Sequence, residues 1–364
     1  MLPFSVSPRG LNAVVDHPRF RETALSRMLE AAPFCFVDVG ARGGVHELAA
    51  PIARHTVSIA FEPDDDECRK LRARYAGTTD WAALEFEPIA LHNQSGTLPL
   101  YLQQVATNHS LLKPNRPFIE RYRMDKFTQV GETQVVVRTL DEVLWERRTR
   151  RAASSPDLIK LDTQGSEFEI LMGAADALRN DVVAVVTEVS FCEVYSGQKL
   201  FSDLDILLRD AGFSFFGFDS FHQRSRRFLD KRTHLFRERA IFGDAVFFKD
   251  PLPGGRAKEP LPLRKLTGLF LSALLTGYHD FALEILEGTE LGRSERKREL
   301  EALVHDLARA APQQAAQAAQ QLSSAVAIDG ERANLEVGRF VDERRHYCDY
   351  HDVFNVSSLP RDYS

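Results

Sequence analysis

Residues 34–44 read Phe-Cys-Phe-Val-Asp-Val-Gly-Ala-Arg-Gly-Gly, an apolar run that leads directly into a turn with three glycines. A strand that is covered by helices on both sides is apolar on both faces, as this run is. Glycines at a strand-to-helix turn let a ligand approach the backbone closely. The segment therefore predicts the first strand of an α/β sheet, with a ligand site at its carboxyl end.

Further β-rich apolar runs follow and alternate with helical patterns. They are residues 57–61, 85–91, 158–162, 182–187, 213–218 and 245–249. This alternation predicts an α/β fold with a mostly parallel, Rossmann-like sheet of seven strands. The last two runs are joined by a turn-rich segment without a clear helix, so we expect an antiparallel edge there.

Residues 94–140 interrupt the alternation with extra strand-like pieces at 97–103 and 133–137, around the polar loop Thr107-Asn-His-Ser110. An insertion over the carboxyl edge of the sheet is where a substrate lid would lie, and a surface loop is the alternative.

Composition also changes along the chain. A Pro/Gly-rich linker at 251–262 separates the strand-rich part from a helical part. We therefore predict an N-terminal helical segment over 1–32, a Rossmann-like domain over 33–252 and a helical extension over 253–364. Amphipathic stripes within 263–325 predict docking on the sheet domain or on a second copy of the chain, as in a homodimer.

Overall composition excludes several classes. The 364 residues carry 46 basic and 52 acidic side chains, a net charge of −6 that disfavours a nucleic-acid binder. Four widely spaced cysteines and the lack of a secretion signal predict a cytoplasmic protein. The longest apolar run, 266–278, is too short to cross a bilayer.

An acid near the glycine-rich turn discriminates between cofactors. Asp38 lies two residues before Gly40, where a carboxylate would repel the pyrophosphate of a dinucleotide. S-adenosylmethionine instead presents a cationic amino group and a sulfonium, which a carboxylate attracts. Glu62, at the end of the second strand, can accept the ribose hydroxyls of either cofactor.

Two further strand ends point to the same crevice. Ile89-Ala90 would offer an apolar edge to an adenine, with plain core packing as the alternative. Asp162 ends the fourth strand, beside Asp38 at the switch point of a doubly wound sheet. The alternative for such an acid is a helix N-cap.

Taken together, these segments resemble the FkbM-type methyltransferases in order and spacing. The segments are Asp38-x-Gly40-Ala-x-x-Gly44, Phe61-Glu-Pro63, Thr139-Leu-Asp-Glu-Val143, Leu158-Ile-Lys-Leu-Asp-Thr-Gln-Gly-Ser-Glu167 and Val185-Val-Thr-Glu188. The family consists of class I, S-adenosylmethionine-dependent enzymes that mostly methylate hydroxyl oxygens. The resemblance covers roughly residues 33–250 and leaves out the last hundred.

The resemblance implies a role for individual residues. Asp38, Gly40, Gly44 and Glu62 would hold the cofactor, Asp162 would line the methyl-transfer pocket, and we expect contacts from Ala41, Arg42, Pro63 and Ala90. One departure is Gln164, where the family more often carries a glutamate.

Methyl transfer to a neutral hydroxyl needs a group that accepts its proton. Asp162 is the first candidate, followed by Glu188 and then His109. Glu188 could equally serve as a hydrogen-bonding acid at a strand end, and His109 could be a solvent-exposed loop histidine. Asp162 and Glu188 could lend two oxygens to a divalent cation, but the spacing supplies no full ligand set, so we predict no metal.

The acceptor leaves one trace in the sequence. Seven basic residues lie between positions 224 and 239, which is typical of an exposed hairpin or of a site for an anionic acceptor such as a phosphate-bearing glycan. We therefore predict an O-methyltransferase that acts on a hydroxyl of a sugar, glycan or natural product. The alternatives are an NAD-linked oxidoreductase and a methyltransferase-like scaffold without turnover.

Overall fold

The computed structural model describes residues 23–77, 81–149, 155–293, 297–309 and 312–345, and the predicted segment 1–32 lies largely outside them. The chain divides into two compact units. Of the described residues, those within 23–226 and 239–308 form the larger unit, and those within 227–238 and 309–345 form the smaller one.

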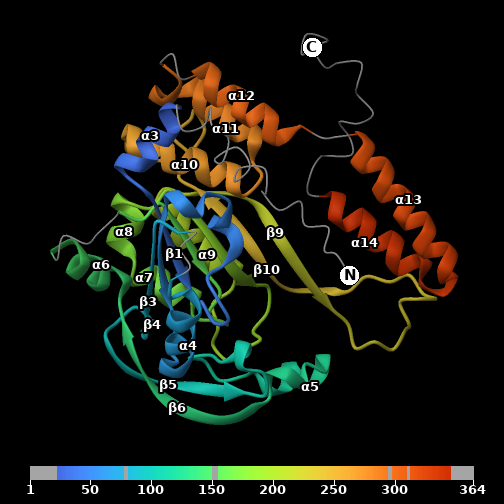
Figure 1. The fold of residues 1–364 in the computed structure, drawn as a ribbon. Coiled ribbons are helices and arrows are strands. Elements are labelled where there is room, and N and C mark those ends of the chain that lie inside the picture. The colour runs from blue at the N-terminus through green and yellow to red at the C-terminus, as the bar shows by residue number, and fades with distance from the viewer. Residues whose placement is uncertain (1–22, 78–80, 150–154, 294–296, 310–311, 346–364) are drawn as a thin grey trace. The chain divides into compact units, whose positions relative to one another are not determined.

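The larger unit is built on a seven-stranded sheet (Figure 1). Its strands are β1 (Phe34–Val39), β2 (Thr56–Phe61), β3 (Ala83–Glu87), β7 (Leu158–Leu161), β8 (Ala184–Ser190), β9 (Ser214–Arg224) and β10 (Arg239–Phe248). They lie in the order β3-β2-β1-β7-β8-β10-β9; the first five are parallel, and β10 is antiparallel to both of its neighbours. The predicted fold class, including the antiparallel end, is confirmed.

Both faces of this sheet are covered. Side chains of a strand point alternately to its two faces, so the residues of β1 contribute to two cores. Phe34 and Phe36 belong to one apolar cluster, and Cys35 and Val37 belong to the other. The second cluster is closed by helices α6 (Leu140–Thr149), α7 (Glu167–Met172), α8 (Ala175–Asn180) and α9 (Phe201–Asp210). The first is closed by α3 (Ala24–Ala31), α10 (Leu263–Leu275), α11 (His279–Gly288) and α12 (Lys297–Ala308).

The helices after the linker therefore complete the sheet domain. Leu269 and Phe270 of α10 are fully buried in the same cluster as Phe34. The compact unit runs on to residue 308, whereas the change in composition predicted a boundary at 252. The linker marks where the chain becomes helical, but the apolar stripe that follows it docks on the sheet, one of the two outcomes we expected.

The insertion forms a second, smaller sheet. Strands β4 (Ala90–Leu91), β5 (Gly96–Gln103) and β6 (Gln129–Arg138) pair in the order β4-β6-β5, and α5 (Arg116–Tyr122) lies between β5 and β6 in the chain. The predicted strand over 85–91 is split at Pro88, which has no backbone N–H to donate to a ladder. Its first half is β3 of the large sheet, and its second half is β4 of the small one.

The smaller unit holds α13 (Pro312–Ile328) and α14 (Ala333–Arg345). The Asn334 side chain donates a hydrogen bond to the Arg232 carbonyl at 3.2 Å. Within the same unit, Arg232 pairs with Asp230 at 2.7 Å and Lys231 pairs with Glu238. Part of the basic charge predicted for an anionic acceptor is thus neutralised locally.

Candidate cofactor and methyl-transfer site

The glycine-rich turn after β1 is fixed by close backbone contacts. Gly40 has a φ of +92°, and the N–H groups of Gly40 and Ala41 both donate to the Phe61 carbonyl, at 3.1 and 3.0 Å. A Cβ atom on Gly40 would lie 2.1 Å from the carbonyl oxygen of Asp162. Only glycine fits here, so this turn brings the carboxyl ends of β1, β2 and β7 together.

Glu62 follows β2 directly and is 3% exposed. Its Oε1 accepts hydrogen bonds from the Asp64 N–H at 2.9 Å and from Arg42 Nη1 at 3.3 Å. Burial raises the pKa of this carboxyl, and the Asp64 N–H and the Arg42 guanidinium oppose the shift. The second guanidinium nitrogen, Arg42 Nη2, lies 2.8 Å from Asp64 Oδ2.

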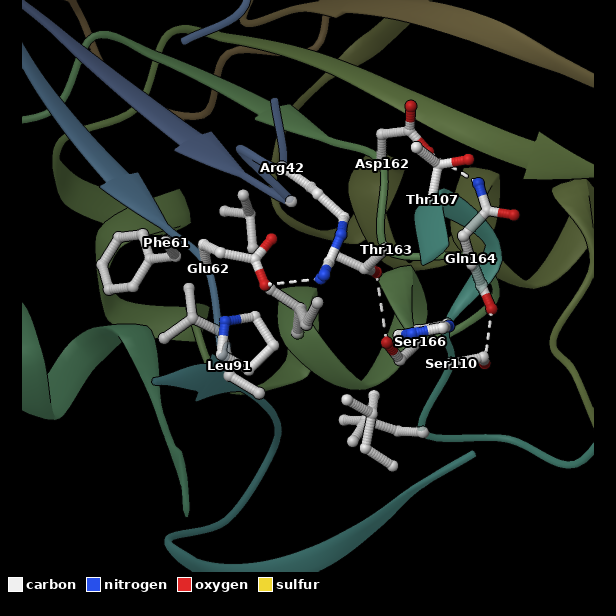
Figure 2. A pocket seen from close by; sticks show the side chains of 18 of the residues that line it. Arg42, Phe61, Glu62, Leu91, Thr107, Ser110, Asp162, Thr163, Gln164 and Ser166 are labelled. Atoms are coloured by element: carbon white, nitrogen blue, oxygen red, sulfur yellow. Dashed lines mark hydrogen bonds and ion pairs between the residues drawn. The ribbon is translucent and has the colours of Figure 1, made fainter. Parts of the chain in front are cut away.

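A cavity lies at this carboxyl edge. Seven of the predicted site residues line it, namely Gly40, Arg42, Glu62, Pro63, Ala90, His109 and Asp162. Figure 2 shows Phe61, Glu62 and Leu91 at one end, Asp162 and Gln164 at the other, and the Arg42 side chain between them. The insertion supplies one wall through Thr107, Ser110 and Leu111.

The other four predicted residues do not line the cavity. Asp38 is 3% exposed and accepts a hydrogen bond from the His46 N–H at 2.7 Å; burial raises its pKa to about 6. Ala41 is buried in the core under the turn. Gly44, at φ +145°, faces the Tyr75 hydroxyl. Glu188 is half-buried in β8, opposite Asp244 of β10.

A buried lysine connects these acids. Lys160 is 3% exposed, and its Nζ lies 3.5 Å from Asp162 Oδ2 and 3.6 Å from Asp244 Oδ1. Burial acts to lower the pKa of Lys160, but the surrounding carboxylates act more strongly, so the net effect raises it. Burial, together with the neighbouring carboxylates of Asp162 and Glu167, raises the pKa of Glu188 well above its usual value. Asp162 is thus the acidic side chain that lines this end of the cavity, and Lys160, Asp244 and Glu188 are not part of the lining.

The turn after β7 holds Asp162 in place. Gln164 Nε2 donates to Asp162 Oδ1 at 2.9 Å, and the Tyr195 hydroxyl donates to Gln164 Oε1 at 3.0 Å. Ser110 Oγ donates to the Gln164 carbonyl at 2.6 Å, which ties the insertion to this turn. The motif over residues 158–167 contains Lys160 and Gln164, and Ser110 ends the polar loop of the insertion where a substrate lid would lie, whereas no sequence pattern indicates Tyr195.

His109 lines the cavity from the insertion. Its Nδ1 accepts a hydrogen bond from the Gln103 N–H at 3.1 Å, so the neutral ring carries its proton on Nε2. Burial, with a contribution from Arg42, lowers the pKa of this imidazole. In this arrangement His109 presents a hydrogen-bond donor at Nε2.

Two kinds of feature are absent from the described residues. No three His, Cys, Asp or Glu side chains in these parts of the chain form a group that could hold a metal ion. Nor does any helix there have the length and apolarity needed to span a membrane.

The fold and this cavity define a Rossmann-like protein of the methyltransferase type. Residues 38–215 match the model of the methyltransferase FkbM domain, and this part of the chain belongs to the FkbM-type methyltransferase family, as the motifs predicted. No curated protein matches the chain.

Three solved structures are only distantly similar to the chain. The methyltransferase FkbM from Methylobacillus flagellatus is 16% identical, with 59% of this chain and 43% of that chain covered and a TM-score of 0.34. Magnesium protoporphyrin IX methyltransferase from Synechocystis, with bound S-adenosylmethionine, is 11% identical, with coverages of 69% and 86% and a TM-score of 0.31. Precorrin-6y C5,15-methyltransferase from Geobacter metallireducens is 10% identical, with coverages of 62% and 87% and a TM-score of 0.29. The chain thus spans less than half of the first of these structures.

Proposed function

We propose that this chain is an S-adenosylmethionine-dependent O-methyltransferase that binds its methyl donor in the cavity between Glu62 and Asp162. The observation that carries the proposal is the buried Glu62 carboxylate at the end of β2, in the wall of that cavity. A carboxylate is costly to bury, and one retained inside a cavity is typical of a binding site. A ribose diol offers the two donors that such a group accepts.

The rest of the cavity fits the same ligand. Gly40 lines the cavity with backbone alone, while Pro63, Ile89 and Ala90 provide an apolar wall suited to an adenine. The acidic end at Asp162 suits the cationic part of the methyl donor. When bound, S-adenosylmethionine supplies a methyl group that is activated by the positive charge on sulfur.

Among the predicted proton acceptors, Asp162 is the best placed. Its carboxylate lines the cavity and is exposed, so it can reach an acceptor hydroxyl. Glu188 lies behind it and does not line the cavity, although its raised pKa would suit a base. His109 presents Nε2–H, so it can hold an acceptor oxygen by donating a hydrogen bond.

The acceptor is proposed to be a hydroxyl of a sugar, glycan or natural product. Hydroxyl, histidine and backbone groups from the insertion (Thr107, His109 and Ser110) border the cavity next to Asp162, as recognition of a polar acceptor requires.

We also propose that the enzyme is cytoplasmic and that it forms a homodimer through its C-terminal helices.

Calorimetric titration with S-adenosylmethionine and, separately, with NAD⁺ tests the cofactor. We expect a micromolar isotherm only with S-adenosylmethionine, and binding of NAD⁺ alone would support the oxidoreductase alternative. Transfer of a tritiated methyl group to a panel of sugars and glycans then tests turnover. Cofactor binding without transfer to any acceptor of a broad panel would favour the scaffold alternative.

A further inference from the structure

Both oxygens of the Asp162 carboxylate have partners within the protein, one from Gln164 in the cavity wall and one from buried Lys160. Oδ1 accepts the hydrogen bond from Gln164 Nε2 at 2.9 Å, and Oδ2 lies 3.5 Å from Lys160 Nζ. The two partners flank Asp162 in the sequence, because Lys160 precedes it in β7 and Gln164 follows it in the turn. The rotation of the carboxylate is therefore restricted by its own neighbours.

The orientation of the Gln164 amide is determined by its surroundings. With Nε2 towards Asp162, its Oε1 accepts from the Tyr195 hydroxyl at 3.0 Å. A flipped amide would place a carbonyl oxygen against the carboxylate at 2.9 Å, which is repulsive. Tyr195 is 2% exposed, so the chain Tyr195–Gln164–Asp162 runs from the core to the wall of the cavity.

The backbone at Gln164 is held in an uncommon conformation. Its φ is +60°, in the left-handed region that non-glycine residues adopt at a cost. Ser110 Oγ holds the Gln164 carbonyl at 2.6 Å, and Glu167 Oε2 accepts from the Gly165 N–H at 3.0 Å. Strain that the surroundings maintain at a cavity wall is typical of a functional position.

The amide at position 164 also offers Asp162 something that a carboxylate would not. A glutamate there would bring a second carboxylate to hydrogen-bond distance of Asp162, and such a pair is stable only when it shares a proton. The glutamine donates instead, so it holds Asp162 without competing for a proton.

We propose that Gln164 is a positioning residue that orients the Asp162 carboxylate towards the sulfonium of the methyl donor and so sets the preference for the donor over the demethylated product. This inference rests on the proposed function. S-adenosylhomocysteine lacks the positive charge on sulfur but shares the rest of the ligand. The ratio of the two affinities therefore isolates the contact between the charge on sulfur and Asp162.

The test measures the dissociation constants of S-adenosylmethionine and S-adenosylhomocysteine by calorimetry for the wild type, Gln164→Leu and Tyr195→Phe. Loss of one charge-assisted hydrogen bond should weaken S-adenosylmethionine binding by Gln164→Leu about tenfold, with S-adenosylhomocysteine unchanged. Tyr195→Phe keeps the ring but removes the hydroxyl, which also lies 3.2 Å from the Asn108 carbonyl, and it should change the ratio in the same direction by a smaller factor. Gln104→Leu, at an exposed position in the insertion, is the matched control and should leave the ratio unchanged.

Equal weakening of both ligands by Gln164→Leu, or no change in either, would overturn the inference while leaving the proposed function intact. Should Gln164→Leu fail to fold, the Tyr195→Phe ratio decides alone, and an unchanged ratio there also overturns it. A wild-type protein that binds neither ligand would instead refute the proposed function.

Discussion

Asp38 should make the cofactor-free protein less stable at neutral pH than in mild acid. The carboxyl is 3% exposed, and burial raises its pKa from 3.8 to about 6. Between these two pH values the folded state holds a proton that the unfolded state has released, so the free energy of unfolding falls as the pH rises. Above pH 6 the Asp38 carboxyl is ionised in both states, so the folded protein bears the full free-energy cost of burying its charge.

The magnitude follows from the shift. About two pH units at about 1.4 kcal/mol each correspond to about 3 kcal/mol. The Asp38→Asn variant keeps a side-chain oxygen that can accept from the His46 N–H, but its amide cannot ionise. The stability of Asp38→Asn relative to wild type should therefore increase by about 2–3 kcal/mol between pH 4 and pH 8.

Urea unfolding of both proteins at pH 4, 5, 6, 7 and 8 measures this difference, and titrations that are common to both proteins cancel. A difference that does not change with pH would refute the reasoning, because it would show that the Asp38 carboxyl titrates alike in the folded and unfolded states. If the stability of Asp38→Asn relative to wild type instead increased towards acid pH, the predicted sign of the effect would be wrong.

Two further substitutions test the local geometry. Gly40→Ala should abolish binding of S-adenosylmethionine, because its Cβ atom would meet the Asp162 carbonyl. Gly43→Ala is the control, since Gly43 has a similar φ of +86° but open space around it, and this variant should bind normally. If calorimetry gave the two variants equal affinities, the argument from the close approach at Gly40 would be wrong. Asp157→Ala should lower the free energy of unfolding by about 3–5 kcal/mol, since it leaves buried Lys265 and the Cys35 N–H without this partner. Urea unfolding would contradict that account if the loss were no larger than for the exposed acid in Asp176→Ala.

The strands of the large sheet could be predicted because each contains an apolar run, and β1, β2, β7 and β8 are buried on both faces. Prediction failed where a local rule competed with the pattern. Pro88 divides one apolar run between two sheets, and the run of apolar residues alone does not show this. The Pro/Gly-rich linker before Leu263 indicates a change of secondary structure, but only the packing of α10 shows that the core continues beyond it.

At the cavity, residues at strand ends and His109 of the insertion could be predicted from the sequence, whereas Tyr195 could not. Glu62 and Asp162 follow strands directly, so their place at the carboxyl edge follows from the topology. Asp38 lies inside β1, and its side chain turns to the His46 N–H instead of the cavity. Tyr195 reaches the Asp162 turn through tertiary contacts that no spacing in the chain encodes.

The affinity for S-adenosylmethionine of Glu62→Ala, compared with that of Asp66→Ala, tests most directly whether the cavity is a methyl-donor site. Both variants lose one negative charge on the same segment, but Glu62 is buried in the cavity wall and Asp66 is exposed. The account predicts at least about tenfold weaker binding for Glu62→Ala and wild-type binding for Asp66→Ala. Wild-type affinity in Glu62→Ala would show that the ligand does not lie on this carboxylate, and the proposed site would be wrong.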